Sequence, residues 1–182
     1  RTAVWDSQKK NGAIFGNSWG LEIPLVFGPA YFKETPSLKR SNAFEIVKKE
    51  HLNVRENVGI LDSTGFSRFE VRGPGAKQWL NQLLATDIPS CNKVKLAVML
   101  GHDGRLKGDL TCFNWGNDVF WIMGSYYLRE WHLRWFYDHL PGGIKNIHTD
   151  GEVSVLDVSD NVGGYAISGP NSRKLLERLT SS

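Results

Sequence analysis

The residue that most directly suggests chemistry is Asp109, an acid in the middle of a largely apolar stretch. Residues 94–124 predict three β-strands separated by two turns, and Asp109 lies in the central strand. Asp103-Gly104 is typical of a tight hairpin turn, because glycine adopts positive φ at little cost. Gly116-Asn117 marks the second turn by similar chemistry. A carboxylate placed here needs a hydrogen-bond donor or solvent, since a buried charge without either is strongly unfavourable.

The register of the first hairpin decides what surrounds Asp109. With Asp103 and Gly104 as the two loop residues, the predicted cross-strand pairs are His102 with Arg105, Leu100 with Lys107, Val98 with Asp109, and Leu96 with Thr111. Because side chains alternate along a strand, Leu96 and Phe113 lie on the same face as Asp109. The opposite face is apolar and seats the sheet on a core.

Two interpretations of Asp109 are open at this point. In the first, it is an edge aspartate that faces solvent, as most aspartates do. In the second, it is a ligand-facing acid in an apolar pocket, the kind of environment in which carboxylates act chemically. The spacing alone does not decide between the two.

Length and composition are those of a globular protein. The chain has 182 residues and a net charge of +3, with acidic and basic side chains interleaved, so it is long enough for a hydrophobic core. The sequence contains no Arg/Lys-rich helix or RNA-binding motif, which argues against a nucleic-acid partner. No apolar run approaches the length of a membrane span. The two cysteines, Cys91 and Cys112, form no disulfide framework and favour a reducing compartment.

The sequence pattern divides the chain into two parts. Residues 1–41 are interrupted by prolines and glycines and predict an extended arm or interdomain linker, with a short helix near Trp5. Residues 42–182 alternate strands and helices, which predicts an α+β fold of antiparallel sheets flanked by helices. Helices are predicted to begin at an Asn42-Glu45 capping box, at Ala76, after Ser125 as an N-cap, and after Asn171. Two further strands are predicted near 145–149 and 153–158.

A strand, a Gly-Pro pair and a helix occur in this order twice. Gly73-Pro74 precedes AKQWLNQLL, and Gly169-Pro170 precedes SRKLLERL. This repeated order of strand, Gly-Pro pair and helix indicates an internal repeat. The second copy is followed by no paired strands, so we expect the chain to stop partway through a larger fold.

Other residues that could do chemistry show no site pattern. The five histidines lack metal-ligand spacing, so we expect no metal site; they are His51, His102, His132, His139 and His148. The glycines lack the spacings of dinucleotide and phosphate loops. Four basic residues surround the first hairpin and either attract an acidic ligand or form a solvated basic face; they are Lys93, Lys95, Arg105 and Lys107.

Four segments together resemble the folate-binding half of the glycine-cleavage T-protein (aminomethyltransferase) superfamily. They resemble more closely the C-terminal region of dimethylglycine and sarcosine dehydrogenases. The segments are GILDSTGFSRFEVRGPGAKQWLNQLLATDIP, VMLGHDGRLKGDLTCF, FWIMGSYYLREWHLRWF and YAISGPNSRKLLERLT. The opening RTAVWDSQKKNGAIFGNSWGLEIP is similar to the segment that joins the flavin and folate domains in those dehydrogenases. The resemblance implies a T-protein-like folate-binding fold that is incomplete at its C-terminus, with residues 42–182 as its N-terminal portion.

The resemblance also implies roles for individual residues. Asp109 matches the family's catalytic acid, which follows the Gly-rich turn and contacts tetrahydrofolate. T-proteins usually have two adjacent acids there, whereas this chain has Gly108-Asp109, a departure that favours the dehydrogenase branch. Pterin-pocket positions of the family match Phe66, Leu96, Phe113 and Ser125. T-proteins often have tyrosine where this chain has Leu96 and Phe113, so the contacts to folate differ in detail.

By this resemblance, the parent protein oxidises an N-methyl amino acid with FAD in an upstream flavin domain that this chain does not contain. The folate domain then transfers the one-carbon unit to tetrahydrofolate. The implied partners are folate, a small amine substrate and the flavin domain, in the bacterial cytoplasm or the mitochondrial matrix. We expect this chain alone to be inactive and to bind folate weakly or not at all. Two alternatives are a non-catalytic regulatory or scaffold protein of the same fold and a folate-dependent demethylase.

Overall fold

The computed structural model describes residues 1–142 and 152–180. Its antiparallel sheets and flanking helices confirm the predicted α+β class. The chain forms two compact units: unit 1 contains Arg1–Gly65 and Gly163–Ser182, and unit 2 contains Phe66–Val162. The division of the chain into residues 1–41 and 42–182 stays a prediction. The strand expected near 145–149 lies outside the described residues.

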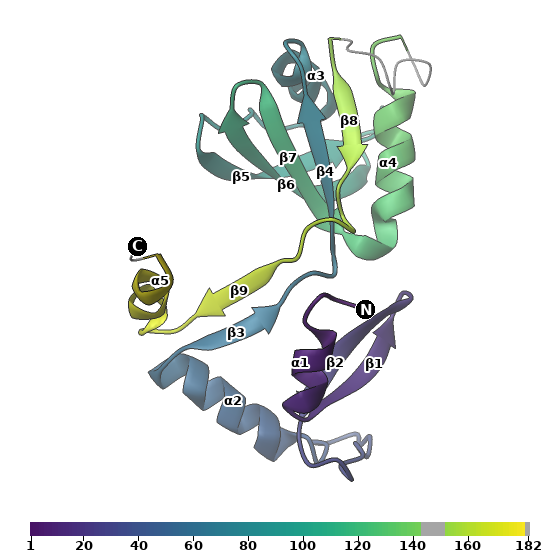
Figure 1. Ribbon diagram of the computed structural model, residues 1–182. Coiled ribbons are helices and arrows are strands. Elements are labelled where there is room, and N and C mark those ends of the chain that lie inside the picture. Colours follow the sequence, from purple (N-terminus) through teal and green to yellow (C-terminus); the bar gives the residue numbers. More distant parts are fainter. Residues whose placement is uncertain (143–151, 181–182) are drawn as a thin grey trace. The chain divides into compact units, whose positions relative to one another are not determined.

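Figure 1 labels the helices and strands of both units. Unit 1 contains α1 (Trp5–Lys10), β1 (Ala13–Ser18), β2 (Leu21–Phe27), α2 (Phe44–Glu56), β3 (Gly59–Asp62), β9 (Tyr165–Ser168) and α5 (Ser172–Thr180). Unit 2 contains β4 (Phe66–Arg72), α3 (Ala76–Leu83), β5 (Lys93–Leu100), β6 (Leu106–Gly116), β7 (Val119–Ser125), the 3₁₀ turn η1 (Tyr126–Leu128), α4 (Arg129–Asp138) and β8 (Ser154–Asp157).

The N-terminal segment is more regular than its prolines suggested. The helix expected near Trp5 is present as α1, and an antiparallel hairpin of β1 and β2 follows it. Trp19 and Gly20 have φ of 53° and 87°, the left-handed conformations that a tight hairpin turn requires. Pro24 is accommodated because the register shifts between Ile14 and Phe15, next to its own pairing position.

The two Gly-Pro junctions have the same geometry. Gly73 and Gly169 have φ of 121° and 124°, and each accepts a backbone hydrogen bond at the start of the following helix, from Ala76 at 2.9 Å and from Ser172 at 3.1 Å. At Gly169 a side chain is also excluded by space, since a Cβ there would lie 2.4 Å from the carbonyl oxygen of Asn57. This shared geometry supports the internal repeat.

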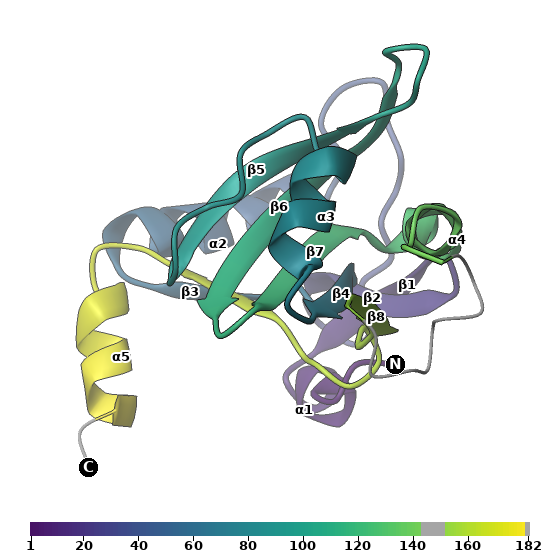
Figure 2. The same ribbon diagram turned by 90° about the horizontal axis from the view of Figure 1, so that it is seen from above.

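Unit 2 is built on a five-stranded antiparallel sheet in the order β5-β6-β7-β4-β8 (Figure 1). Helices α3 and α4 pack on one face of this sheet, and Figure 2 shows both from above. The core between them is apolar and closely packed; its fully buried members include Phe69, Leu80, Leu110, Ile122 and Phe136. Burial raises the pKa of Cys112, which faces this core, to about 11.

Both turns of the sheet differ in detail from their predicted form. In the first, Gly104 donates its amide hydrogen to the carbonyl of Gly101, and Gly101 donates to Arg105, so the loop has three residues rather than two. The predicted pairs of Leu100 with Lys107 and His102 with Arg105 are therefore wrong, because Leu100 pairs with Leu106. In the second turn, Asn117 and Asp118 are the central residues, with φ of 51° and 55°.

Two predicted helix caps are also wrong. Helix α2 begins at Phe44 after Ala43, and the Asn42 side chain instead bonds the backbone of Thr35 and Lys33. Ser125 ends β7, pairs with Phe66, and makes no side-chain cap. In both cases another part of the chain bonds or pairs with the residue that the local pattern assigned to the cap.

An ion-pair network joins α4 to the end of β8. Arg129 donates from Nε to Asp157 and from Nη1 to Asp160 at 2.9 Å, and the Arg129 and Asp157 side chains are only 19% and 13% exposed. Charge-assisted hydrogen bonds with little solvent are worth about 1.5–3 kcal/mol. We expect Arg129→Met to lower the free energy of unfolding by about that amount, measured by urea denaturation.

Arg72→Met is the matched control, because Arg72 pairs with Glu70 but its side chain is 59% exposed. Exposed ion pairs contribute about 0–1 kcal/mol. Equal losses in the two variants would show that the Arg129 network adds nothing beyond a surface pair.

Candidate functional site

The face of the five-stranded sheet opposite α3 and α4 is partly exposed in unit 2, with Arg68, at 5% exposure, its buried member. We call it the open face and define it by the alternate residues of four strands: Val94, Leu96, Val98, Asp109, Thr111, Phe113, Trp121, Met123, Ser125, Phe66, Arg68 and Glu70. One row of paired residues crosses all four strands: Leu96 pairs with Thr111, Thr111 with Met123, and Met123 with Arg68. Apolar side chains on it are notably accessible: Leu96 is 64% exposed, Val94 55% and Phe66 43%.

The structure places all five predicted site residues on the open face. Asp109 pairs with Val98, as predicted, and Leu96 pairs with Thr111 next to it. Phe113 follows on β6, and Phe66 and Ser125 pair with each other on β4 and β7. The registers thus bring together residues from four strands.

The enclosed apolar pocket expected around Asp109 is not formed by unit 2. Asp109 is exposed, as is Leu96 beside it. The physical reason is that both helices of the unit pack on the opposite face, so that within the described residues of unit 2 no helix covers Asp109 and Leu96.

An aromatic and acidic group lies further along the open face. The rings of Phe113 and Trp115 stack at 6.2 Å, and Trp121 meets Trp115 edge-on at 5.7 Å. Trp121 donates its indole N–H to Glu70 at 3.0 Å. Burial raises the pKa of Glu70, but hydrogen bonds from Arg72 and Trp121 outweigh it and leave that pKa below its usual value. Trp121 and Glu70 were not predicted as site residues. Strand alternation, counted from Ser125 and from Phe66, would have placed them on this face.

The pairing of β6 with β7 stops short of Asp109. It ends at Thr111 and Met123, whereas β6 goes on to pair with β5 as far as Leu106, and β7 with β4 as far as Ser125. Asp109 and Ser125 therefore lie on neighbouring strands at a level where the two strands do not share ladder pairs.

His132 of α4 lies beneath this level, on the core side of the sheet. Its side chain is 1% exposed, and a Cβ added to Gly108 would lie 2.9 Å from its Nε2. A Cβ at Gly124 would lie 3.3 Å from its Nδ1. Neither ring nitrogen makes a hydrogen bond of good geometry within the described part of the chain. Burial lowers the pKa of His132, and the backbone of Lys107 and the charge of Asp109 oppose this effect.

The lowered pKa of His132 predicts a loss of stability in weak acid. The unfolded imidazole takes up its proton near pH 6.5, above the pKa of the folded state. Stability from the neutral ring is therefore complete above about pH 6.5 and falls as the pH drops toward the folded pKa, by up to about 1.4 kcal/mol per pH unit. Urea midpoints at a series of pH values, compared with those of His132→Leu, measure the effect. The leucine variant should lose this acid-side slope, and equal slopes would contradict the assignment.

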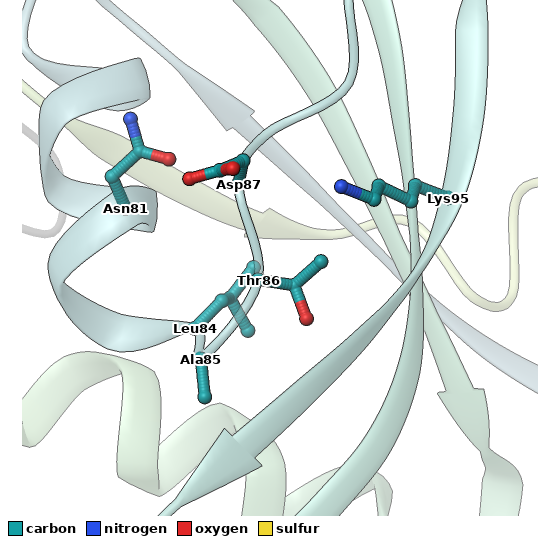
Figure 3. A pocket seen from close by; sticks show the side chains of 6 residues that line it. All are labelled: Asn81, Leu84, Ala85, Thr86, Asp87 and Lys95. Carbon is teal, nitrogen blue, oxygen red and sulfur yellow. The ribbon is translucent and has the colours of Figure 1, made fainter.

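A surface cavity of about 460 Å³ lies beside α3, away from the predicted site residues (Figure 3). It is lined by Asn81, Leu84, Ala85, Thr86, Asp87 and Lys95. In Figure 3 the Lys95 ammonium points toward the Asp87 carboxylate. One of the four basic residues around the hairpin is therefore directed toward an acid, although its side chain is exposed.

Neither a metal cluster nor a membrane helix is found in residues 1–142 and 152–180. No group of three or more His, Cys, Asp or Glu side chains there could hold a metal ion. None of the helices in that part of the chain is both long and apolar enough to cross a membrane. His148 lies outside it.

Comparison with known proteins places the chain in a family. The profile of the GCVT N-terminal domain matches residues 4–182. Mitochondrial dimethylglycine dehydrogenase of Mus musculus is 29% identical over 147 residues, which cover 80% of this chain and 16% of that protein. The aminomethyltransferase of Chloroherpeton thalassium is 31% identical over 133 residues, which cover 72% of this chain and 34% of that protein.

A solved structure agrees with the sequence comparisons. The glycine cleavage system aminomethyltransferase T from Bartonella henselae superposes with a TM-score of 0.75 at 19% identity, covering 96% of this chain and 42% of that chain. The chain thus spans less than half of the length of each of these relatives. The resemblance inferred from the sequence is confirmed: the fold is that of the T-protein, and this is an aminomethyltransferase-like domain related to dimethylglycine dehydrogenase. The chain belongs to the GCVT N-terminal domain family.

Proposed function

We propose that the open face binds tetrahydrofolate and serves one-carbon transfer in an N-methyl amino acid dehydrogenase. The single observation that carries this proposal is the register of β5 and β6, which sets one carboxylate, Asp109, among the apolar side chains of Leu96, Val98 and Phe113. A flat heteroaromatic ring with N–H groups suits such a surface, because its faces pack on apolar side chains and its N–H groups donate to the carboxylate.

In this proposal each residue has a separate task. Asp109 accepts a hydrogen bond from a folate amine, assists proton transfer and stabilises positive charge on the iminium substrate. Phe66, Leu96 and Phe113 hold the pterin and exclude water. When bound, tetrahydrofolate supplies the nucleophilic amines that take up the one-carbon unit.

The remaining parts of the proposal follow the dehydrogenase branch of the family. The iminium comes from an N-methyl amino acid oxidised by FAD in a flavin domain outside this chain. The relatives include a protein named as mitochondrial and aminomethyltransferases of bacteria, in keeping with a site in the mitochondrial matrix or the bacterial cytoplasm. Because Asp109 is exposed in unit 2, we expect this chain alone to be inactive and to bind folate weakly.

Calorimetric titration with tetrahydrofolate tests the proposal. In the full-length protein that contains this chain, we expect Asp109→Asn to weaken binding by about tenfold or more, since a charge-assisted hydrogen bond becomes a neutral one. Asp103→Asn, in the exposed loop of the same hairpin, is the matched control and should bind like the wild type.

The titration, together with a turnover assay with N-methyl amino acids, separates the competing functions. A scaffold of the same fold would bind no tetrahydrofolate in either form, and that result would overturn the proposal. A demethylase would bind it normally but would not turn over with N-methyl amino acids. Tight binding by the isolated 182-residue chain would show that the open face needs no further covering.

A further inference from the structure

We propose that His132 is a positioning residue for Asp109. Its imidazole, seated beneath Gly108 and Gly124, holds in place the segments of β6 and β7 from which Asp109 and Ser125 project. This inference extends the proposed function. It depends on the proposed function in one respect, the role of Asp109 as the acid.

The contact depends on two glycines at matching places. Gly108 precedes Asp109 and Gly124 precedes Ser125, so the missing side chains of the two glycines belong to the core face. The ring occupies the space that those side chains would fill, as the distances of 2.9 Å and 3.3 Å to the added Cβ atoms show. A side chain at Gly108 would have to displace the imidazole, whereas one at Gly124 would press on the ring and, more closely, on Leu110 Cδ2 at 2.7 Å.

The ring is placed where the sheet itself does not tie its strands together. Beyond Thr111 and Met123, no ladder pair fixes β6 relative to β7. His132 touches both strands there, and it is held from below by α4, stacking on Phe136 at 6.4 Å and meeting Trp131 edge-on at 5.5 Å. Packing on a shared ring thus replaces backbone pairing between the two segments.

The ring and the carboxylate also interact electrostatically across the strand. The charge of Asp109 favours the protonated imidazole and so raises the pKa of His132 against the effect of burial. Among the described residues, the titratable groups that act on the ring belong to Asp109 and Lys107, both on β6, and the Lys107 ammonium lies 5.8 Å from the Trp135 ring of α4. The other neighbours, Gly124, Trp131 and Phe136, do not titrate.

The coupling is measured by an NMR pH titration of the His132 ring, without folate. The ring signal is assigned as the one missing from His132→Leu. In Asp109→Asn we expect the His132 midpoint to fall by about half a pH unit, as expected for loss of one charge through a partly solvated sheet. Asp103→Asn should leave the midpoint unchanged. An unchanged midpoint in Asp109→Asn would overturn the electrostatic part of the proposal.

The positioning is tested by a mutant cycle read from backbone amide signals. Gly108→Ala pushes on the ring, and we expect it to shift the amide signals of both Asp109 and Ser125. With His132→Leu in the same chain, the shift at Ser125 should be at least halved, because the ring links the strands. An undiminished shift at Ser125 would show that the strands are coupled without His132 and would overturn the proposal.

A second substitution guards against loss of folding. If Gly108→Ala does not fold, Gly124→Ala takes its place with Asp109 as the reporter. Its added Cβ meets Leu110 Cδ2 at 2.7 Å as well as the ring at 3.3 Å, so only the part of the Asp109 shift that is lost with His132→Leu is assigned to the ring. A shift that survives His132→Leu in full would overturn the proposal. Gly163→Ala, where a Cβ meets nothing closer than 3.6 Å, controls for the extra methyl group and should move neither signal. Because these measurements need no folate, failure of folate binding would refute the proposed function and leave the role of His132 standing.

Discussion

Asp109→Asn is expected to reduce the rate of one-carbon transfer about 10²–10⁴-fold in the full-length protein that contains this chain, the range usual for loss of a general acid or base. Asparagine keeps the size of the side chain but can neither take up a proton nor balance the positive charge of an iminium. The exposed position of Asp109 on the open face makes a large effect on folding unexpected. Formation of methylene-tetrahydrofolate from an N-methyl amino acid, followed by single-turnover kinetics, measures the change.

Two comparisons make this expectation specific. Oxidation of the amine by the flavin, followed separately, should be unchanged in Asp109→Asn, because the proposal places that step outside this chain. Asp103→Asn should transfer one-carbon units at the wild-type rate. If the rate of transfer survives in Asp109→Asn, the open face is not the site of the chemistry, whatever its affinity for folate.

Phe136→Ala is expected to lower the free energy of unfolding by about 3–5 kcal/mol, the range for removal of a fully buried aromatic ring. Phe136 is 1% exposed and meets Phe69 at 5.1 Å and Trp79 at 6.3 Å, both edge-on. Its loss leaves a cavity between α4, α3 and β4. Because these elements are closely packed, we expect them to relax little into the cavity. Urea denaturation of wild type and variant at pH 7.5 measures the difference, since the neutral His132 ring then contributes fully.

Trp115→Ala serves as the exposed counterpart, because Trp115 packs against Phe113 and Trp121 of the open face. Trp115 is larger than Phe136 and stacks on Phe113, but it is 53% exposed. We expect a loss of only about 1 kcal/mol, mainly from the stacked pair. A loss as large as that of Phe136→Ala would mean that the open face, and not only the helix-covered face, contributes to the core.

The face and register of Asp109 could be predicted from the sequence, although the prediction gave the wrong loop length and missed a bulge. The two errors cancel. The predicted two-residue loop is one residue too short, since the turn closes from Gly101 to Arg105. A bulge between Met99 and Leu100 absorbs the difference, so that Val98 still pairs with Asp109. Strand alternation then gave the correct face, because it depends only on the register beyond the bulge.

The surroundings of Asp109 could not be predicted in the same way. The alternation of side chains placed the core on the face opposite Asp109, which is where α3 and α4 pack, but it did not show whether any element covers the face of Asp109 itself. The place of His132 likewise depends on packing between elements distant in sequence. One local signal was available: a glycine stands directly before each of two site residues on adjacent strands, Asp109 and Ser125. Such paired glycines indicate close approach from the opposite side of the sheet.

The pairing of β3 with β9 has a consequence for how the molecule assembles. Gly59 faces Ser168, so the whole of unit 2 is contained in the loop that this short two-stranded ladder closes. Closing a loop of roughly a hundred residues is entropically unfavourable, whereas each hairpin of the five-stranded sheet closes locally. During synthesis, unit 2 can therefore form its core before β9 leaves the ribosome. Strand β3 has no strand partner until β9 has been released. In hydrogen exchange, the β3 and β9 amides should accordingly be the first strand amides to lose protection.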